Sequence, residues 1–405
     1  MPEAVIVSTA RSPIGRAGKG SLKDMRPDDL TVQMIEAALA KVPGLDRRDI
    51  TDLHLGVGQP AGEGGHNLAR AVAVLAGMDH LPGVTVNRYC SSSLQTTRMA
   101  FHAIKAGEGD AFISAGVETV SRFGNGFADL PGTENPAFAE AIARTAKRAE
   151  GGADTWTDPR ESGSLPDLYI AMGQTAENVA QYLGMSRREQ DEFAVRSQNL
   201  VEQRIEEGFW AKDITPVTLA DGTTVTKDDG PRAGTTLEAV SGLKPVFRPD
   251  GTVTAGNACP LNDGAAAVVI MSDTKAKELG LTPLARIVST AVTGLSPEIM
   301  GLGPVEAIPA ALKNAGMGID DIDLYEINEA FAVQAWGSAK QLGIPLDKLN
   351  VNGGAIAVGH PFGMTGARIT STLINSLQWH DKQFGVESMC VGGGMGMAMV
   401  LERLS

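Results

Sequence analysis

The chain has 405 residues, 43% of them hydrophobic, and this length and composition predict a globular protein with a large core in two or three domains. The formal net charge of −13 at pH 7 argues against nucleic-acid binding, and no apolar run reaches the ~18 residues that a membrane span needs. Because the three cysteines are too few for a disulfide scaffold and the N-terminus lacks a secretion signal, we expect a cytoplasmic protein.

The first predicted element is a buried strand at residues 6–10, whose sequence IVSTA returns at residues 287–291. Three further pairs of similar segments follow in the same order: 35–39 with 308–312, 49–53 with 321–324, and 84–87 with 349–352. Matches that stay in register indicate two copies of one strand-and-helix unit. We therefore predict a pseudo-symmetric α/β fold.

The segment between the two copies is richer in charge and in Gly, Pro, Asp and Thr. It contains one clear amphipathic helix, predicted for residues 186–207, and is interpreted as an inserted loop domain. A buried strand predicted at residues 265–271 then closes the first copy. The predicted division is residues 1–121 for the N-terminal half, 122–253 for the loop domain, 254–280 for the return of the first half, and 281–405 for the C-terminal half.

Cys90 is the first candidate for chemistry. It lies in the sequence NRYCSSSLQ at residues 87–95, after an apolar strand and before a helical pattern. At a helix N-terminus, free N–H groups and the helix dipole lower the pKa of a cysteine, which suits a nucleophile. The alternative for a lone cysteine is a small buried hydrophobic residue.

Asn328 begins the sequence NEAF at residues 328–331, directly after the apolar run at residues 324–327. Its side chain should therefore emerge at a strand end, where sites form in α/β proteins. The alternative is that Asn328 caps a helix.

His360 lies in the glycine-rich sequence NGGAIAVGHPFG at residues 352–363, which the repeat makes the counterpart of the Cys90 segment. Two such loops can meet at one pocket, where a histidine could accept the Cys90 proton. The alternative is a histidine that caps a turn.

Cys390 stands in the glycine cluster MCVGGGMG at residues 389–396. A second thiol suits reversible proton transfer at carbon, and a redox pair with Cys90 is a secondary interpretation. We expect no metal site, because the cysteines lie far apart in sequence and have no Cys-x-x-Cys spacing.

Together these segments resemble the thiolase family over nearly the whole chain. The motifs that carry the resemblance are NEAF at residues 328–331, the glycine-rich segment 352–366 with its Gly-His-Pro triplet at 359–361, and CVGGG at 390–394. The fold implied is a duplicated, pseudo-symmetric α/β/α/β/α arrangement of layers with an inserted loop domain that binds CoA.

The resemblance also implies a mechanism of CoA-dependent acyl transfer. Cys90, deprotonated by His360, attacks the keto carbon of a 3-ketoacyl-CoA, Cys390 protonates the departing acetyl-CoA enolate, and CoA takes the acyl group. His360 and a water on Asn328 would hold the enolate oxygen, and the backbone N–H groups of Cys90 and Gly392 would hold the tetrahedral oxyanion. CoA is then a cosubstrate, and no permanent cofactor is expected. The reverse reaction is a Claisen condensation.

For CoA itself, similarity implies Arg232 beside the adenine and nucleotide phosphates, with Met172 and Met300 lining the pantetheine channel. Cys259 belongs to the same predicted set of CoA contacts. It stands with Pro260 where the biosynthetic acetoacetyl-CoA thiolases carry Ser-Gly.

Two more positions depart from the biosynthetic enzymes: Ala171 replaces a histidine, and Ala239 replaces a serine that contacts CoA. The segment 123–168 is also longer, which leaves their tetramer contacts in doubt. These departures favour a degradative 3-ketoacyl-CoA thiolase of fatty-acid or related β-oxidation, with a biosynthetic acetoacetyl-CoA thiolase as the alternative.

The resemblance further implies a homodimer or homotetramer built through the first-half sheet, and a partner enzyme of β-oxidation is a further expectation.

A ketoacyl synthase of the same superfamily should lack Cys390. A noncatalytic lipid- or CoA-binding paralogue would need an incomplete site, and a Cys-His hydrolase would need neither the repeat nor a second thiol. Acyl chain length and physiological direction stay open.

Overall fold

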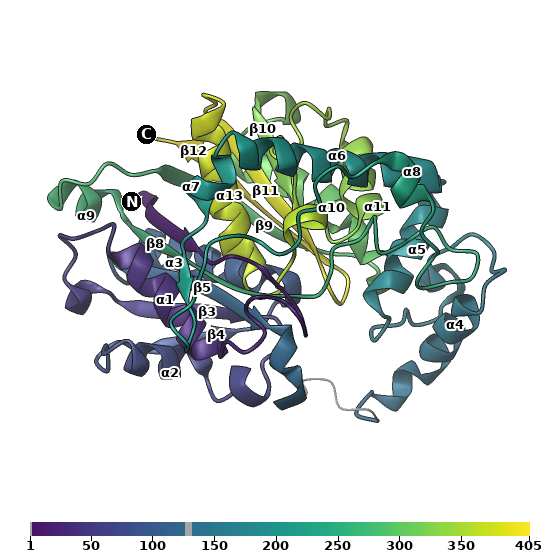
Figure 1. Ribbon diagram of the computed structural model, residues 1–405, viewed down its shortest axis with the longest axis horizontal. Helices are drawn as coiled ribbons and strands as arrows, with labels where there is room; N and C mark the ends of the chain where they lie inside the picture. The colour runs from purple at the N-terminus through teal and green to yellow at the C-terminus, as the bar shows by residue number, and fades with distance from the viewer. Residues whose placement is uncertain (1, 126–131) are drawn as a thin grey trace.

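The computed structural model describes residues 2–125 and 132–405 (Figure 1). Its main element is a 10-stranded mixed sheet with the strand order β10-β11-β12-β9-β1-β8-β5-β3-β4, to which β2 adds beside β8. The strands of this sheet are β1 (Ala4–Arg11), β2 (Gly15–Arg16), β3 (Asp52–Val57), β4 (Gly83–Val86), β5 (Ala111–Thr119), β8 (Asn262–Ser272), β9 (Ala285–Gly294), β10 (Leu324–Ile327), β11 (Phe384–Val391) and β12 (Met395–Arg403). A separate two-stranded sheet pairs β6 (Val217–Thr218) with β7 (Thr224–Val225).

The α-helices are α1 (Pro27–Leu39), α2 (Leu68–Leu75), α3 (Ser92–Ala106), α4 (Ala139–Ala149), α5 (Met172–Leu183), α6 (Arg187–Glu206), α7 (Phe209–Asp213), α8 (Leu237–Ser241), α9 (Asp273–Glu278), α10 (Gly303–Ala315), α11 (Ala332–Leu342), α12 (Ala355–Val358) and α13 (Thr365–Trp379). None of the helices in the described ranges has the length and apolar character needed to cross a bilayer.

The two halves of the large sheet repeat each other strand by strand. The first runs β3-β5-β8-β1 and the second β10-β11-β12-β9, with a parallel first pair and antiparallel pairs after it in both. The two IVSTA segments fall in β1 and β9, which join the halves through the pairs Val5 with Arg286 and Ile6 with Ala285. The predicted pseudo-symmetric α/β fold is therefore confirmed.

The alternation of side chains along β1 separates two cores. Val5 and Val7 point into a cluster with α1 and α2, whereas Ala4 and Ile6 point into a cluster with α3 and α13. A third cluster packs α10 and α11 on the far side of the second half. The result is three helix layers separated by the two half-sheets, the predicted α/β/α/β/α order (Figure 1).

Between β5 and β8 the chain forms α4 to α8 and the small β6-β7 sheet. The predicted amphipathic helix is α6, which begins with a reciprocal capping box between Ser186 and Glu189. In Figure 1, α5, α6 and α8 lie along the green and yellow second half, and α4 lies farther out. Helices α5 and α6 pack against α11, which anchors this segment to the C-terminal half.

Candidate active site

Cys90 lies in a single 3-10 turn, Tyr89–Ser91, between the end of β4 and the start of α3. Tyr89 has a φ of 44°, a left-handed backbone conformation that is uncommon for a bulky residue and often marks a functional turn. The Cys90 residue is only 8% exposed, yet it lines a cavity of about 340 Å³. Its thiol is therefore sheltered from bulk water but reachable from the cavity.

The expected low pKa of Cys90 is wrong. Burial, with a smaller contribution from the Glu118 carboxylate, raises the pKa of this thiol to about 11. Loss of hydration disfavours the thiolate more than the nearby backbone N–H groups can favour it. Cys90 thus rests as a neutral thiol and needs a base during attack.

Cys390, at the end of β11, is followed by a glycine turn that packs on the nucleophile loop. A Cβ built on Gly392 would lie 3.3 Å from Cγ of Tyr89, and Gly393 has the left-handed φ of 77° that glycine allows. A backbone hydrogen bond from Gly392 to Cys90 lowers the pKa of the thiol and partly offsets its burial. This N–H group therefore faces the sulfur that would carry the acyl group.

The three cysteines converge although they are distant in sequence. Burial raises the pKa of Cys390 well above its ordinary value, and repulsion from the Cys90 and Cys259 thiolates raises it further. Burial likewise raises the pKa of Cys259 to about 12, with Cys90 as the next contributor. All three are free thiols.

His360 is 1% exposed and follows α12. Its backbone N–H donates to Oδ1 of Asn262 over 3.0 Å, and its Nδ1 lies 2.6 Å from Oγ1 of Thr365. Because the Thr365 hydroxyl donates to the carbonyl of Pro361, it accepts from Nδ1–H, which leaves Nε2 as the basic nitrogen. Among the described residues Nε2 has no hydrogen-bond partner, so it is available to take a proton.

Burial, with a smaller contribution from the charge of Arg368, lowers the pKa of His360 to about 3. The imidazole is therefore neutral at physiological pH. Because the thiol and the imidazole are both neutral at rest, the thiol would have to give up its proton in order to act as a nucleophile.

The loop after His360 and the helix after Cys90 are locked together. The backbone N–H of Ala367 donates to Oγ of Ser93 over 2.9 Å. A Cβ on Gly366 would overlap the backbone nitrogen of Leu94, so only glycine permits this approach of α13 to α3. The two loops that the repeat pairs are thus brought together in space.

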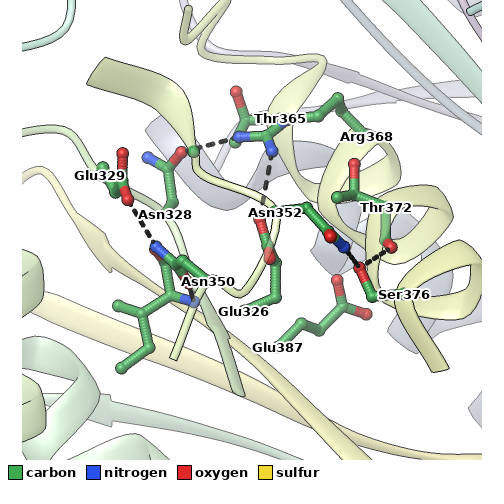
Figure 2. A network of polar contacts seen from close by, with 12 residues as sticks. Glu326, Asn328, Glu329, Asn350, Asn352, Thr365, Arg368, Thr372, Ser376 and Glu387 are labelled. Atoms are coloured by element: carbon green, nitrogen blue, oxygen red, sulfur yellow. Dashed lines mark hydrogen bonds and ion pairs between the residues drawn. The ribbon is translucent and has the colours of Figure 1, made fainter. Parts of the chain in front are cut away.

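Asn328 follows β10 directly, and α11 begins later, with Phe331 as its N-cap. The strand-end interpretation is confirmed and the helix-cap alternative is wrong. The Asn328 side chain is buried, and its Oδ1 accepts from Nη2 of Arg368 over 3.1 Å (Figure 2). Its Nδ2 has no partner in the described part of the chain, so the N–H donors of this amide stay free.

Arg368 joins Asn328 and Glu326 in a buried polar network, and Glu387 lies near Glu326 (Figure 2). Nη1 of Arg368 lies 3.4 Å from Oε1 of Glu326. Burial raises the pKa of Glu326 to about 8, and Arg368 opposes that rise. Burial also raises the pKa of Glu387, whose carboxylate accepts from Oγ1 of Thr370. One guanidinium thus faces two carboxyl groups that resist ionisation.

Glu118 ties a third loop to the site. Its Oε2 accepts from the backbone N–H groups of Gly58 and Gly363, each over 2.8 Å. Burial raises the pKa of this carboxyl to about 7, against the lowering by these hydrogen bonds. Glu118 therefore fixes the His360 loop to the end of β3.

A second cavity, of about 550 Å³, holds the predicted CoA residues Arg232 and Cys259, together with Ala239 and Arg16. Met172 lines the Cys90 cavity instead. Met300 is buried in the apolar cluster that contains Cys390. The structure thus places the predicted CoA contacts on three neighbouring parts of the site.

Sequence reasoning missed Arg368 and Glu118. Glu118 lies near the end of β5, so the strand-end argument that found Asn328 could have found it. Arg368 lies in the first turn of α13, and no local pattern distinguishes it from a surface arginine. Only the long-range packing of α13 buries it.

Comparison with known proteins gives consistent matches. The family model "Thiolase, N-terminal domain" matches residues 4–274, and "Thiolase, C-terminal domain" matches residues 281–403. A 3-ketoacyl-CoA thiolase of Bacillus subtilis is 44% identical, over 99% of this chain and 100% of its own. A 3-oxoadipyl-CoA/3-oxo-5,6-dehydrosuberyl-CoA thiolase of Escherichia coli is 43% identical over 100% of both chains.

Two solved structures share the fold. The Bacillus anthracis acetyl-CoA acetyltransferase has a TM-score of 0.86 and 40% identity, covering 100% of this chain and 99% of that one. The dimeric peroxisomal thiolase of Saccharomyces cerevisiae has a TM-score of 0.87 and 36% identity, covering 99% of this chain and 97% of that one.

Proposed function

The chain belongs to the thiolase family, and from this premise we propose that it cleaves 3-ketoacyl-CoA with CoA, giving acetyl-CoA and a shortened acyl-CoA. The observation that carries the assignment of residues is the position of Cys90, which lines a cavity and receives the Gly392 hydrogen bond. The enzyme is an acyltransferase that uses CoA as a substrate.

In the first half-reaction, Sγ of Cys90 attacks the C3 carbonyl carbon while its proton passes to Nε2 of His360. The C2–C3 bond then breaks, and its electron pair forms the enolate of acetyl-CoA. Cys390 protonates C2 of this enolate. The high pKa of the buried Cys390 thiol suits this step, because a weak acid returns readily to the protonated state.

In the second half-reaction, the thiol of CoA attacks the Cys90 thioester and loses its proton to the thiolate that Cys390 became in the first. The acyl group leaves on CoA, and Cys90 regains its proton from Nε2 of His360. The backbone N–H groups of Cys90 and Gly392 would hold the tetrahedral oxyanion, and one such donor is typically worth about a hundredfold or more in rate.

Asn328 supports the enolate oxygen together with His360. Its Nδ2 is buried and has no partner among the residues that the structure describes, which fits a bound water between Asn328 and the substrate oxygen. After His360 has taken the Cys90 proton, Nε2–H also becomes a donor toward this oxygen.

CoA is proposed to enter by the larger cavity. Arg232 and Arg16 give that cavity two cations for nucleotide phosphates, and Cys259 lies at its end nearest Cys90. We propose that Met172 and Met300 flank the pantetheine path toward the thiols.

We also propose a homo-oligomer, supported by the likeness to the dimeric yeast enzyme, and a cytoplasmic location, in keeping with three free thiols. The number of subunits, two or four, and a partner enzyme of β-oxidation stay predictions. The domain limits at residues 121, 253 and 280 are proposed from composition and the repeat.

Thiolysis is the direction we propose, with biosynthetic condensation of two acetyl-CoA molecules as the alternative. The Cys90 cavity of about 340 Å³ has room for a chain longer than the acetyl group that condensation requires. A comparison of steady-state thiolysis of 3-ketoacyl-CoAs of increasing length with acetyl-CoA condensation tests the direction.

Identification of the acyl-enzyme tests the mechanism. The protein is incubated with acetoacetyl-CoA, quenched in acid and digested, and the acetylated peptide is sequenced by mass spectrometry. We expect acetyl on Cys90 alone, and none in the Cys90→Ser variant under the same conditions. An acetyl group on Cys259 or Cys390 in the wild type would overturn the assignment.

A further inference from the structure

The cavity that Cys90 lines is walled by several separate parts of the chain. The segment after β3, the Phe362 loop, the glycine turn at Gly392 and residues 168–172 of the loop domain all contribute, and Thr133 and Glu134 complete the wall. Because the thiol faces this cavity, the acyl chain of a substrate bound at Cys90 extends into it.

The wall segment that carries Glu134 is anchored. The next residue, Asn135, donates its backbone N–H to the hydroxyl of Tyr169 over 3.0 Å, and the Tyr169 ring packs edge-to-face on Phe138 at 5.5 Å. Tyr169 itself lines the cavity. The backbone next to Glu134 is therefore held, and Glu134 lines the cavity while it stays exposed to solvent.

The charges of the two cavities are opposite. Arg16 and Arg232 line the CoA cavity, whereas Glu134 is the one charged residue among the described residues that line the Cys90 cavity. Arg88, next to the nucleophile turn, directs its guanidinium to Gln95 and Met395. The buried carboxyl of Glu118 adds negative charge close enough to Cys90 to raise the pKa of its thiol.

We infer that this enzyme selects 3-ketoacyl chains that end in an uncharged group and rejects chains that end in a carboxylate, with Glu134 as the residue that discriminates. The inference rests on the proposed thiolytic function and names its substrate class. A terminal carboxylate would lie in a cavity whose described lining offers no cation to pair with it, and it would face Glu134. Contacts between like charges provide specificity by repulsion. The dicarboxylic substrates named for the 43% identical E. coli relative are thus excluded for this chain.

A matched substrate pair tests the inference. 3-Oxohexanoyl-CoA and 3-oxoadipyl-CoA have six acyl carbons each and differ by a methyl group against a carboxylate. The readout is the ratio of their kcat/KM values in thiolysis, measured for the wild type, for Glu134→Gln, and for the control Glu140→Gln. The control removes the same charge from the exposed first turn of α4.

The wild type should favour 3-oxohexanoyl-CoA by at least about fivefold at low salt, and the ratio should fall as salt is raised, since Glu134 is exposed. Glu134→Gln should lower the ratio at low salt, and Glu140→Gln should leave it as in the wild type. If the wild type cleaved 3-oxoadipyl-CoA as well as or better than 3-oxohexanoyl-CoA, the inference would be overturned and the proposed function would stand. An unchanged kcat/KM ratio in Glu134→Gln would have the same meaning. Failure to cleave either substrate would overturn the proposed function as well.

Discussion

Arg368 donates a hydrogen bond from Nη2 to Oδ1 of Asn328, and this contact holds the oxygen end of the amide. The other end, Nδ2, has no partner within residues 2–125 and 132–405. Both side chains are buried, so surface water does not compete for the contact. We therefore propose that Arg368 is a positioning residue that works through Asn328.

Arg368→Lys should lower kcat about tenfold with a smaller change in KM, because lysine lacks the planar fork that serves Asn328 and Glu326 together. In an Asn328→Ala background the same substitution should cost little more, since the two residues act as a unit. Steady-state kinetics of the four proteins measures the coupling. An equal loss of kcat in both backgrounds, with unchanged melting temperatures, would contradict the positioning role.

The reactivity of Cys90 should keep rising with pH. Because burial raises the pKa of this thiol to about 11, the thiolate fraction grows about tenfold per pH unit through pH 9. The test is the rate of inactivation by iodoacetamide between pH 7 and 9.5 in the Cys259→Ser variant, which removes the neighbouring thiol. A plateau near pH 8.5, the ordinary cysteine value, would show that the thiol is not desolvated.

Cys390→Ala should separate acyl transfer from proton transfer. Cys90 should still take an acyl group from acyl-CoA, because that exchange needs no proton at carbon. Exchange of deuterium from D₂O into the methyl group of acetyl-CoA should fall at least about a hundredfold. NMR of acetyl-CoA follows the second reaction and mass spectrometry the first. Exchange at the wild-type rate would remove Cys390 from the mechanism.

Burial of His360 should make the fold sensitive to acid. The folded pKa is about 3, whereas the unfolded value is about 6.5. Between these pH values the unfolded chain binds a proton at His360 that the folded chain does not bind. The free energy of unfolding therefore falls as pH falls below 6.5.

His360→Asn lacks this group. As pH falls from 6 to 4, the free energy of unfolding of the wild type should decline relative to the variant by up to about 1.4 kcal/mol per pH unit. Urea denaturation at each pH measures the difference. Two parallel curves would mean that His360 is protonated or solvated in the folded state.

The sequence repeat predicted the fold well, because it reports long-range symmetry that local propensity does not contain. Residues 6–10 and 287–291 proved to be equivalent strands on either side of the junction between the half-sheets. Asn328 was found for a related reason, since polar side chains after an apolar strand must emerge at the edge of the sheet.

The electrostatics of the site could not be predicted in the same way. A helix N-terminus indicates a low cysteine pKa, but the depth at which Cys90 is buried depends on the Gly392 turn, hundreds of residues away. Arg368 and Glu118 are ordinary charged residues in sequence, and they gain their roles from the packing of α13 and of the His360 loop. Burial is a property of the assembled chain.

The contact of α13 with α3 through Gly366 leaves no space for even a methyl group. Evolution therefore has little freedom to alter the reacting groups, since nearly any change at this crossing would displace them. The wall at residues 133–134 belongs to a different segment, so its side chains can change without altering this crossing. New acyl preferences should arise there first, and directed-evolution libraries are best confined to that wall.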